Sequence, residues 1–235
     1  MRFTSITDRG GREINKDSFT KLCRDGIYCF VMADGEGAGG ETGAELITKS
    51  AAAAFDEMHE VTEDCAAACI NAASSAFREF VADNPNYCEM TASAAVLITD
   101  GKTAVCAHVG NIRLYYMPKG VISFVTNDHT TAMEKYASGA ISFDEIRTYD
   151  NNRLTLAIDG VSEPEPETGG PFKIGDKTAF LLCTDGFWLN IDEESMEESL
   201  KKTRSSKEWL ASMLRTMEET TPADCGNITV AAIIM

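Results

Sequence analysis

The 235-residue sequence predicts an α+β fold, a four-layer αββα sandwich in which two central antiparallel β-sheets are flanked by antiparallel helix pairs. Strand-like and helix-like segments come in blocks instead of alternating strictly. Turn dipeptides of the kind found in hairpins join most of the strand-like segments, which favours antiparallel pairing. Hydrophobic residues make up 44% of the sequence, enough to bury a sizeable core. We expect residues 1–235 to form one domain.

The first part of the sequence predicts strands that lead into two helices. Ser18–Arg24 and Ile27–Ala33 flank Asp25-Gly26, a favoured dipeptide of tight hairpins, and follow a weakly alternating segment at Arg2–Thr7. The next two segments, Glu41–His59 and Glu63–Val81, carry apolar residues at helical spacing.

The remaining elements follow from the same signals of apolar pattern and turns. The predicted strands are Thr91–Thr99, Thr103–Val109, Arg113–Met117, Val121–Thr126, Phe172–Ile174, Thr178–Cys183 and Asn227–Met235. The predicted helices are Glu193–Lys201 and Ser206–Glu219, with short helices in residues 129–150. Residues 160–171, rich in proline and glutamate, read as a loop. Together, two antiparallel sheets with outer helix pairs would bury every apolar face.

Composition argues against several classes of function. A net charge of −16 disfavours partners with anionic surfaces, so we expect neither nucleic acid nor membrane as a partner. The first residues contain no apolar stretch of signal-peptide length, and no segment approaches the roughly 18 apolar residues of a membrane span. We therefore expect a cytoplasmic protein. The eight cysteines include no C-x-x-C pair and read as reduced thiols, with Cys23, Cys29, Cys106 and Cys183 inside apolar strands.

Two of the five Asp-Gly dipeptides do not fit hairpin turns. Asp25 and Asp100 have strands on both sides, as the favoured turn dipeptide requires. Asp34 and Asp185 each end a strongly apolar strand and lead into a helix, with no returning strand. A carboxylate at the mouth of a buried strand is costly unless it is paired or bound to a cation. Two such carboxylates at equivalent strand ends could share a pair of divalent metals, which activates water and holds a phosphoryl group.

The glycine-rich segment after Asp34 also matches a dinucleotide-binding pattern. Gly35–Gly40 has the G-x-G-x-x-G spacing, follows a strand and opens a helix. A dinucleotide-binding unit would next need a second parallel strand that ends in an acidic residue. A second helix and a series of hairpins follow instead, so we set aside a nucleotide-binding oxidoreductase.

Six sequence blocks in order resemble the metal-dependent (type 2C) protein phosphatase family. The blocks are Arg12-Glu-Ile-Asn-Lys-Asp-Ser-Phe19, Phe30-Val-Met-Ala-Asp-Gly35, His108-Val-Gly-Asn-Ile-Arg113, Asn127-Asp-His-Thr130, Leu181-Leu-Cys-Thr-Asp-Gly-Phe-Trp188 and Gly226-Asn-Ile-Thr-Val230. The resemblance implies the same layered fold and hydrolysis of phosphoserine and phosphothreonine in proteins by a water held between two Mn²⁺ or Mg²⁺ ions. It also implies phosphoprotein substrates and, in a bacterium, an opposing serine/threonine kinase.

The resemblance assigns roles to five positions. Asp34 would bridge the two metals, and the Gly35 carbonyl would bind one of them. Asp185 would ligate the first metal, and Asp17 would support the second, directly or through water. Arg12 would hold the substrate phosphate through charge-assisted hydrogen bonds. Asp34 and Asp185 are thus the expected catalytic centre.

The sequence departs from the family pattern at several of these blocks. Gly226 stands where the family usually has a metal-ligating aspartate, and Asn111 stands where bacterial members have an aspartate for a third metal. Lys16 replaces an acidic residue or glutamine, and its amine would repel a nearby cation. Asp224 and Glu36 lie near these positions in sequence and, with Asn111, are candidates for weak or compensating ligands.

Two functional hypotheses follow from these residues. In the first, the protein is a working phosphatase with altered metal affinity, as Asp34, Asp185, Asp17 and Arg12 indicate. In the second, it is a pseudophosphatase that binds one metal or none and serves as a module for phosphoproteins or a regulatory partner. Gly226, Asn111 and Lys16 motivate the second hypothesis. Residues 130–150 occupy the place of the family's mobile flap.

Overall fold

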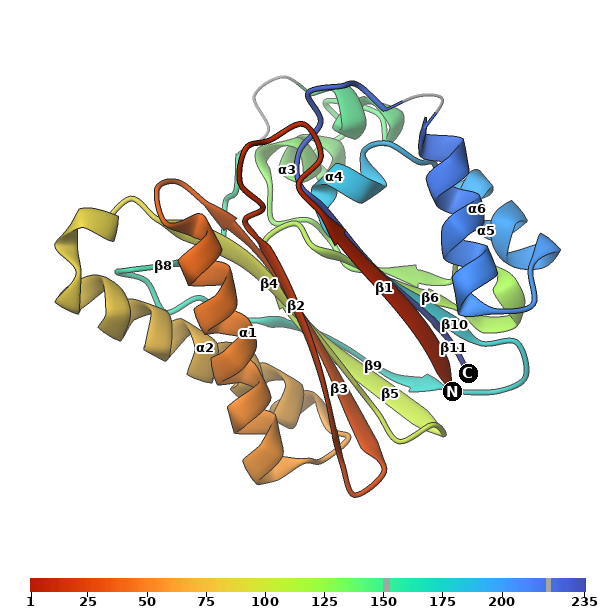
Figure 1. Cartoon of the computed structure of the whole chain (residues 1–235), viewed down its shortest axis with the longest axis horizontal. Helices are drawn as coiled ribbons and strands as arrows, with labels where there is room; N and C mark the ends of the chain where they lie inside the picture. The colour runs from red at the N-terminus through yellow and green to blue at the C-terminus, as the bar shows by residue number, and fades with distance from the viewer. Residues whose placement is uncertain (150–152, 219–220) are drawn as a thin grey trace.

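The computed structural model describes residues 1–149, 153–218 and 221–235, and these form four layers in the order helix, sheet, sheet, helix (Figure 1). One sheet has the strand order β1-β11-β10-β6-β7, and the other has the order β2-β3-β4-β5-β9, with β8 paired to β4. Every strand pair is antiparallel. The predicted fold class is confirmed.

The bounds of the elements follow the predicted segments closely. The strands are β1 (Arg2–Asp8), β2 (Asp17–Arg24), β3 (Ile27–Glu36), β4 (Thr91–Thr99), β5 (Thr103–Val109), β6 (Arg113–Met117), β7 (Phe124–Val125), β8 (Ile158–Asp159), β9 (Glu167–Lys173), β10 (Ala179–Cys183) and β11 (Ile228–Ile234). The α-helices are α1 (Gly40–Met58), α2 (Glu63–Asp83), α3 (Thr131–Ala137), α4 (Asp185–Trp188), α5 (Glu193–Lys202) and α6 (Ser206–Glu218). Short 3₁₀ turns are η1 (Pro85–Tyr87), η2 (Pro118–Gly120) and η3 (Asp144–Thr148).

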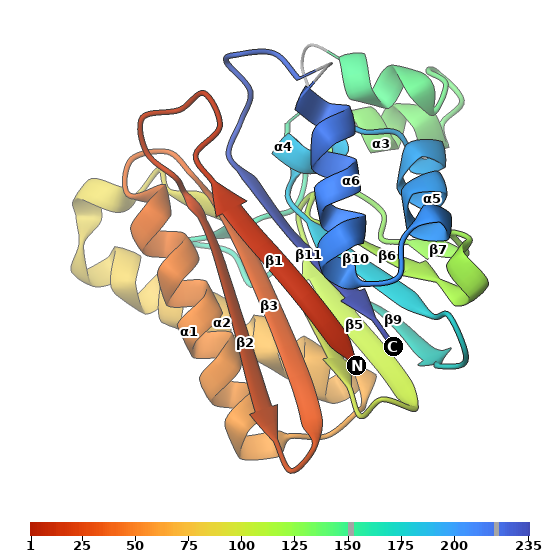
Figure 2. The same cartoon turned by 45° about the vertical axis from the view of Figure 1, so that its right-hand side comes forward.

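Three buried apolar clusters hold the layers together. Helices α1 and α2 pack on one sheet through residues such as Phe55 and Phe77. Helices α5 and α6 pack on the other sheet around Trp188 and Trp209. The third cluster, which includes Phe30 and Phe180, lies between the two sheets. Figure 2 shows the two helix pairs on the outer faces of the sheets. Burial of large apolar side chains at all three levels is the main favourable term for this arrangement.

Local signals explain where several elements begin and turn. Asp25 and Gly26 have positive φ angles of 50° and 83°, as a type I′ hairpin turn between β2 and β3 requires. Thr62 caps α2 by accepting a hydrogen bond from the backbone N–H of Cys65. Asp192 caps α5 in the same way through the N–H of Ser195.

Two predicted elements differ from the structure. The predicted loop at residues 160–171 ends early, because β9 begins at Glu167 and pairs with β5 from His108 to Thr103. Its two glycines and Pro171 interrupt the apolar alternation from which a strand is usually predicted. The predicted strand Val121–Thr126 shrinks to β7, and Val121 instead follows the turn η2.

Smaller differences concern helix ends and cysteines. Short helices occur in residues 129–149 as predicted, whereas Asp150 lies outside the described residues. The predicted last residue of α6, Glu219, also lies outside them. All eight cysteines are free, as expected, but Cys23 is exposed on the sheet surface and not buried in the core. Among the described residues, no helix combines the length and apolar character needed to cross a membrane.

Candidate active site

Three aspartates from the two sheets converge at one end of the sandwich. Asp17 begins β2 and pairs directly with Asp34 near the end of β3. Asp185 follows β10 of the other sheet and begins the one-turn helix α4. Asp34 and Asp185 line the same cleft, which has a volume of about 450 Å³. The prediction that two strand ends bring these carboxylates to one place therefore agrees with the geometry.

The backbone around Asp34 is shaped to let the loop turn back on the strand end. A side chain at Gly35 would overlap the carbonyl group of Gly40, so the close approach of these two backbone segments requires glycine. Gly35 lines the cleft beside Asp34. The glycine-rich segment thus serves the turn from β3 into α1 and places Gly35 in the lining of the cleft beside Asp34.

Burial raises the pKa values of all three carboxyl groups, and a neighbouring carboxylate raises each of them further. Desolvation is the largest cause in each case. The neighbouring charges of Asp185 and Asp17 raise the pKa of Asp34 further. Burial raises the pKa of Asp17 to about 6, although hydrogen bonds with the side chains of Thr229 and Thr184 act in the opposite direction. Carboxyl groups held together in this way need protons or a cation to offset their repulsion.

The hydrogen bonds of Asp17 leave one of its oxygens without a partner. Thr184 donates its hydroxyl to Asp17 Oδ2 at 2.9 Å, whereas Oδ1 is buried and has no hydrogen-bond partner within the described parts of the chain. A buried carboxylate oxygen of this kind normally finds a donor or a cation. With Asp34, Asp185 and the Gly35 carbonyl, the cleft offers the hard oxygen donors that Mn²⁺ and Mg²⁺ prefer. The residues therefore fit a divalent cation.

Asn111 holds Asp185 in place through its amide nitrogen, while its amide oxygen faces Ser93. Its amide nitrogen donates to Asp185 Oδ2 at 3.0 Å, and its Oδ1 accepts a hydrogen bond from Ser93 at 2.9 Å. The hydrogen bond to Asp185 lowers the pKa of that carboxyl group, although burial dominates and the net shift is upward. This hydrogen bond places Asn111 to orient the Asp185 carboxylate.

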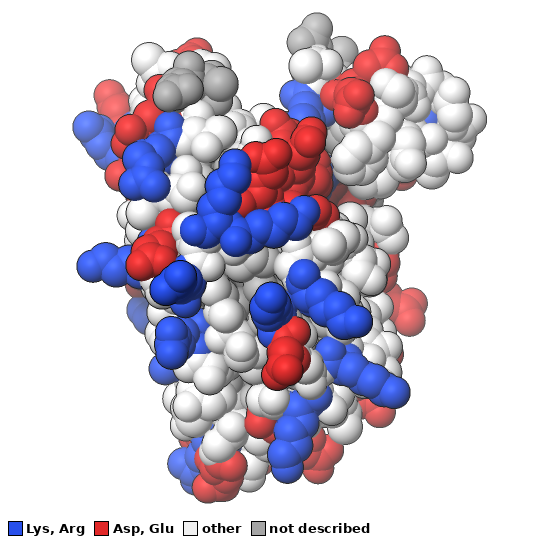
Figure 3. Space-filling view, turned by 90° about the vertical axis from the view of Figure 1, so that its right-hand side faces the viewer, with Lys and Arg blue, Asp and Glu red and all other residues white. Residues whose placement is uncertain are grey.

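Basic side chains border the cleft. Arg12 is exposed, lines the cleft, and its charge favours the ionised form of Asp185. Lys16 also lines it, and its amine donates to the Gly37 carbonyl at 2.7 Å. Viewed from the side of α5 and α6, acidic side chains gather in a hollow at one end of the molecule, with lysine and arginine along its edge (Figure 3).

The remaining predicted residues divide into those that reach the cleft and those that do not. Gly226 lines the cleft, and a Cβ there would lie 4.0 Å from Asp185 Oδ1, with no close contact. Glu36 is exposed and lines both this cleft and a neighbouring cavity of about 660 Å³ that also contains Asp185 and Asn111. Asp224 is exposed and is not among the residues that line either cavity.

Two polar residues that support the site had no role assigned from the sequence. Asn227 accepts a hydrogen bond from the backbone N–H of Lys16 and donates to the carbonyls of Arg9 and Ile14, so it holds the loop that carries Arg12. Thr184 bridges Asp17 and the backbone of β11. Both lie next to predicted positions, but Asp17 and Lys16, the partners that they hold near the cleft, are more than 160 residues away in sequence, and only the folded sheets bring them together.

A second polar cluster lies at the ends of β5 and β9. The rings of His108 and His129 are stacked with centroids 4.7 Å apart, and His129 contacts Glu167 at 3.3 Å. His129 Nδ1 accepts the backbone N–H of Gly110, so its Nε2 carries the proton and donates to Glu167. His108 Nε2 donates to the Asn127 carbonyl at 2.8 Å. These bonds fix the loop after β7 and leave the His129 ring without a free lone pair for a metal.

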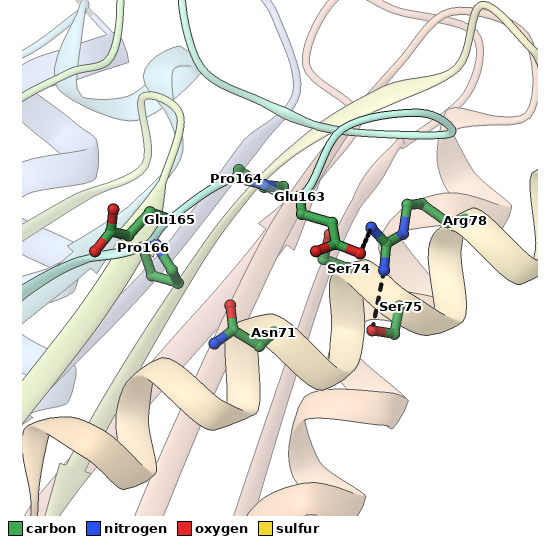
Figure 4. A pocket seen from close by; sticks show the side chains of 8 residues that line it. All are labelled: Asn71, Ser74, Ser75, Arg78, Glu163, Pro164, Glu165 and Pro166. Carbon is green, nitrogen blue, oxygen red and sulfur yellow. Dashed lines mark hydrogen bonds and ion pairs between the residues drawn. The ribbon is translucent and has the colours of Figure 1, made fainter.

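Another cavity lies far in sequence from all predicted site residues. Helix α2 and residues 163–166 enclose about 350 Å³, and Arg78 pairs there with Glu163 (Figure 4). None of the three aspartates of the cleft lines this cavity. Most of the predicted site residues thus gather at the cleft between the two sheets and not at this cavity.

Known proteins resemble this chain in sequence and in fold. The sequence model described as Protein phosphatase 2C matches residues 9–227. The serine/threonine protein phosphatase PstP of Mycobacterium tuberculosis is 27% identical over 208 residues, which cover 86% of this chain and 39% of the relative. The serine/threonine phosphatase stp of Listeria monocytogenes is 33% identical over 106 residues, 44% of this chain and 41% of the relative. The chain thus matches about two fifths of the length of these curated relatives.

Solved structures show the same fold. The M. tuberculosis phosphatase PstP has a TM-score of 0.86 at 23% identity, with 98% of this chain and 97% of that chain covered. Stp1 from Staphylococcus aureus has a TM-score of 0.89 at 19% identity, with 99% and 94% covered. The catalytic domain of PstP in complex with two manganese ions has a TM-score of 0.80 at 22% identity, with 98% and 96% covered.

Proposed function

Since the chain belongs to the protein phosphatase 2C family, we propose that it is a metal-dependent phosphatase that hydrolyses phosphoserine and phosphothreonine in proteins. The observation that carries the proposal is the convergence of Asp17, Asp34 and Asp185, with a buried oxygen of Asp17 left without a partner. The names of the relatives given above support the same activity.

The carboxylates and one carbonyl would hold the metal. Asp34 would contact both metal ions, and the Gly35 carbonyl would bind one of them. Asp185 would bind the first ion, and Asp17 would support the second ion directly or through water. Mn²⁺ or Mg²⁺ bound there would activate water and stabilise charge on the phosphoryl oxygens. The two manganese ions in the complex of the related PstP domain support this choice of metal.

The surrounding residues would place the substrate and the ligands. Arg12 lies at the exposed edge of the cleft, where its guanidinium can form paired, charge-assisted hydrogen bonds with a phosphate group. Asn111 would keep the Asp185 carboxylate in one orientation through its 3.0 Å hydrogen bond. Asn227 would fix the loop that carries Arg12.

Two substitutions set the strength of metal binding in this proposal. Gly226 leaves space beside Asp185 that is not filled by a carboxylate. The ammonium of Lys16 contacts the Gly37 carbonyl, next to Glu36 in sequence. Burial and the charge of Asp185 raise the pKa of Glu36, and the charge of Lys16 opposes part of this rise. We therefore expect weaker loading with Mn²⁺ than in a site with an acidic residue at position 226, and a second ion to bind more weakly than the first.

The biological setting follows from the reaction. Phosphoserine and phosphothreonine proteins would be the substrates, and a serine/threonine kinase in the cytoplasm would produce them. The kinase is part of the proposal because a substrate of this reaction must first be phosphorylated.

The test is phosphate release from a phosphothreonine peptide at increasing Mn²⁺ concentration, with wild type and Asp34→Asn. We expect Mn²⁺-dependent hydrolysis in the wild type and a loss of at least about 100-fold in Asp34→Asn, which keeps the shape but removes the shared charge. If the wild type stays inactive with Mn²⁺ and with Mg²⁺ while it still binds the phosphopeptide, the protein is a binding module and the enzymatic proposal is wrong.

A further inference from the structure

A basic groove lies at the end of the sheet opposite the carboxylates. It has a volume of about 540 Å³ and lies between η2, the start of β10, the end of β11 and the connection from α5 to α6. Its apolar floor includes Leu200 and Ile234, and four basic residues line it: Lys119, Lys177, Lys201 and Arg204. This region lies near the C-terminus and the lower ends of α5 and α6 in Figure 2.

The charge of the groove is opposite to that of the molecule. The chain has 37 acidic and 21 basic residues, yet the lining of the groove includes four basic residues and no acidic one. Lys201 pairs with Glu197 at 3.1 Å on its own helix, and Asp176 precedes Lys177 in sequence. Within the described parts of the chain, Lys119, Lys177 and Arg204 form no ion pair. Three cations around an apolar floor thus remain available to a partner.

Two of these lysines occupy backbone positions that favour glycine. Lys119 has φ 57° and Lys177 has φ 60°, in the left-handed region that L-residues rarely adopt. Both lie in tight turns at the same end of the sheet, where glycine or asparagine would fit at lower cost. The backbone geometry of these turns does not require lysine. The lysine at each turn nevertheless places a long cationic side chain at the groove.

We propose that this groove binds an acidic segment of a partner protein. Apolar side chains of the segment would cover Leu200 and Ile234, and flanking Asp or Glu side chains would pair with Lys119, Lys177 and Arg204. The lining carries four basic residues and no acidic one in a chain with a net charge of −16, so an acidic segment is the partner of complementary charge. A recessed groove admits a single extended segment, whereas a flat membrane surface would not reach its apolar floor.

The groove and the carboxylates are separate along the central strands. Ala179 and Ile234, which line the groove, pair with each other at one end of β10 and β11, and Cys183 pairs with Val230 toward the other end. Asp185 lies six residues beyond Ala179, on the order of 20 Å at about 3.3 Å per residue. A bound segment would therefore leave the active-site cleft open, and its binding does not depend on the proposed hydrolysis.

Fluorescence anisotropy with a labelled peptide tests the inference. The probe has two leucines flanked on each side by three glutamates, and it is titrated with wild type and with the double variant Lys119→Gly and Lys177→Gly. Glycine suits both positive φ angles, so the variant keeps its turns while it loses two charges. We expect salt-sensitive binding to the wild type and affinity at least about 10-fold lower in the double variant.

Matched controls separate the groove from general charge effects. A second double variant, Lys49→Gln with Lys102→Gln, also removes two positive charges but lies outside the groove. We expect it to change the affinity for the peptide less than about twofold. Peptides with glutamine for glutamate, or serine for leucine, are expected to bind more weakly than the probe. All variants should hydrolyse a short phosphopeptide at equal rates, so that a loss of binding is distinguishable from a failure of the active site.

Three outcomes would overturn the inference. The first is absence of peptide binding to the wild type at low salt. The second is equal affinity in wild type and the Lys119 and Lys177 double variant. The third is binding of the protein to phosphatidylglycerol vesicles, lost in the double variant, without binding of the peptide, which would assign the groove to a lipid surface.

Discussion

At the scale of single residues, the site depends on carboxyl groups that are buried together with few donors to stabilise their charge. Desolvation raises the pKa values of Asp17, Asp34 and Asp185, and their proximity adds repulsion. Thr184 and Asn111 each supply one hydrogen bond to this group. These bonds fix orientation but do not neutralise charge, so a cation is the natural completion of the site.

Gly226→Asp should strengthen metal binding. The new Cβ would make only ordinary contacts, 3.9 Å from the Gly186 Cα and 4.0 Å from Asp185 Oδ1, and the added carboxylate would lie beside Asp185. We expect the Mn²⁺ affinity to rise about 10-fold, equal to about 1.4 kcal/mol. Gly226→Asn is the matched control because it has the same size without charge. Equal Mn²⁺ affinities of the two variants in calorimetry would show that position 226 does not face the metal.

Asp17 should make the stability of the metal-free protein depend on pH. Burial raises its pKa from 3.8 to about 6, so between these pH values the folded state binds more protons than the unfolded state. Stability from this group is present below about pH 4 and is lost as pH rises through about 6, by up to about 3 kcal/mol. Urea unfolding in EDTA at pH 4.5–7.5 measures the free energy of unfolding of wild type and Asp17→Asn. We expect this free energy to fall with rising pH in the wild type, and the contribution of Asp17 to that slope to be absent in the variant. Parallel pH profiles of the two proteins would exclude a raised pKa at Asp17.

The sequence predicts some of these residues and not others for a physical reason. Asp34 and Asp185 stand out because each follows an apolar strand and lacks the returning strand of a hairpin. Thr184 and Asn227 act through hydrogen bonds to residues of distant segments, and sequence periodicity contains no information on such pairs. Asn111 is identified as a departure from the family pattern, but its bond to Asp185 depends on how the two sheets are stacked.

At the scale of elements, a buried ion pair connects β6 to the segment after β7. Arg113 donates to both oxygens of Asp128, at 2.9 and 2.7 Å, and its guanidinium lies 3.6 Å from the centroid of the Trp188 ring. Both side chains of the pair are at most 2% exposed. The pair thus joins the sheet that carries Asp185 to the loop with His129, which borders the neighbouring cavity through Thr130.

Asp128→Ala should destabilise the protein strongly. The substitution leaves the buried Arg113 guanidinium without its bidentate partner, which typically costs about 3–5 kcal/mol. Urea denaturation at pH 7 measures the change in the free energy of unfolding. Lys49→Ala, which removes an exposed pair with Glu45, is the control and is expected to have a much smaller effect. A small effect of Asp128→Ala would mean that Arg113 finds another acceptor, such as Glu193 at 3.4 Å.

The elements that the sequence predicts least well are those without a regular apolar pattern. Strand β9 contains two glycines and a proline, so its pairing with β5 comes from tertiary contacts and not from its own residues. Strand β7 is short because η2 uses the preceding residues for a turn. Helices α1 and α2, in contrast, have long buried faces, and their predicted bounds agree closely with the structure.

At the scale of the whole molecule, the stacking of two sheets creates the active-site cleft. Asp34 comes from one sheet and Asp185 from the other, so neither sheet alone forms the site. A metal bound between them would connect the two halves of the sandwich. Ligands that bind only the folded state increase stability by mass action.

Mn²⁺ should therefore raise the thermal stability of the protein. At a concentration about 100 times the dissociation constant, the expected gain is about 2.7 kcal/mol at pH 7. Thermal denaturation followed by circular dichroism, with Mn²⁺ and with EDTA, measures the shift in Tm. Asp34→Asn should show no such shift. The same shift in wild type and Asp34→Asn would place the bound metal elsewhere.

The most direct test of the metal site is calorimetric titration with Mn²⁺ at pH 6 in two buffers of different ionisation enthalpy. We expect saturable binding to the wild type with release of at least about half a proton, because a carboxyl group with a pKa of about 6 is half protonated at this pH. Asp34→Asn should bind at least about 10-fold more weakly. An absence of binding by the wild type, or equal binding by Asp34→Asn, would contradict the account that these carboxylates form a metal centre.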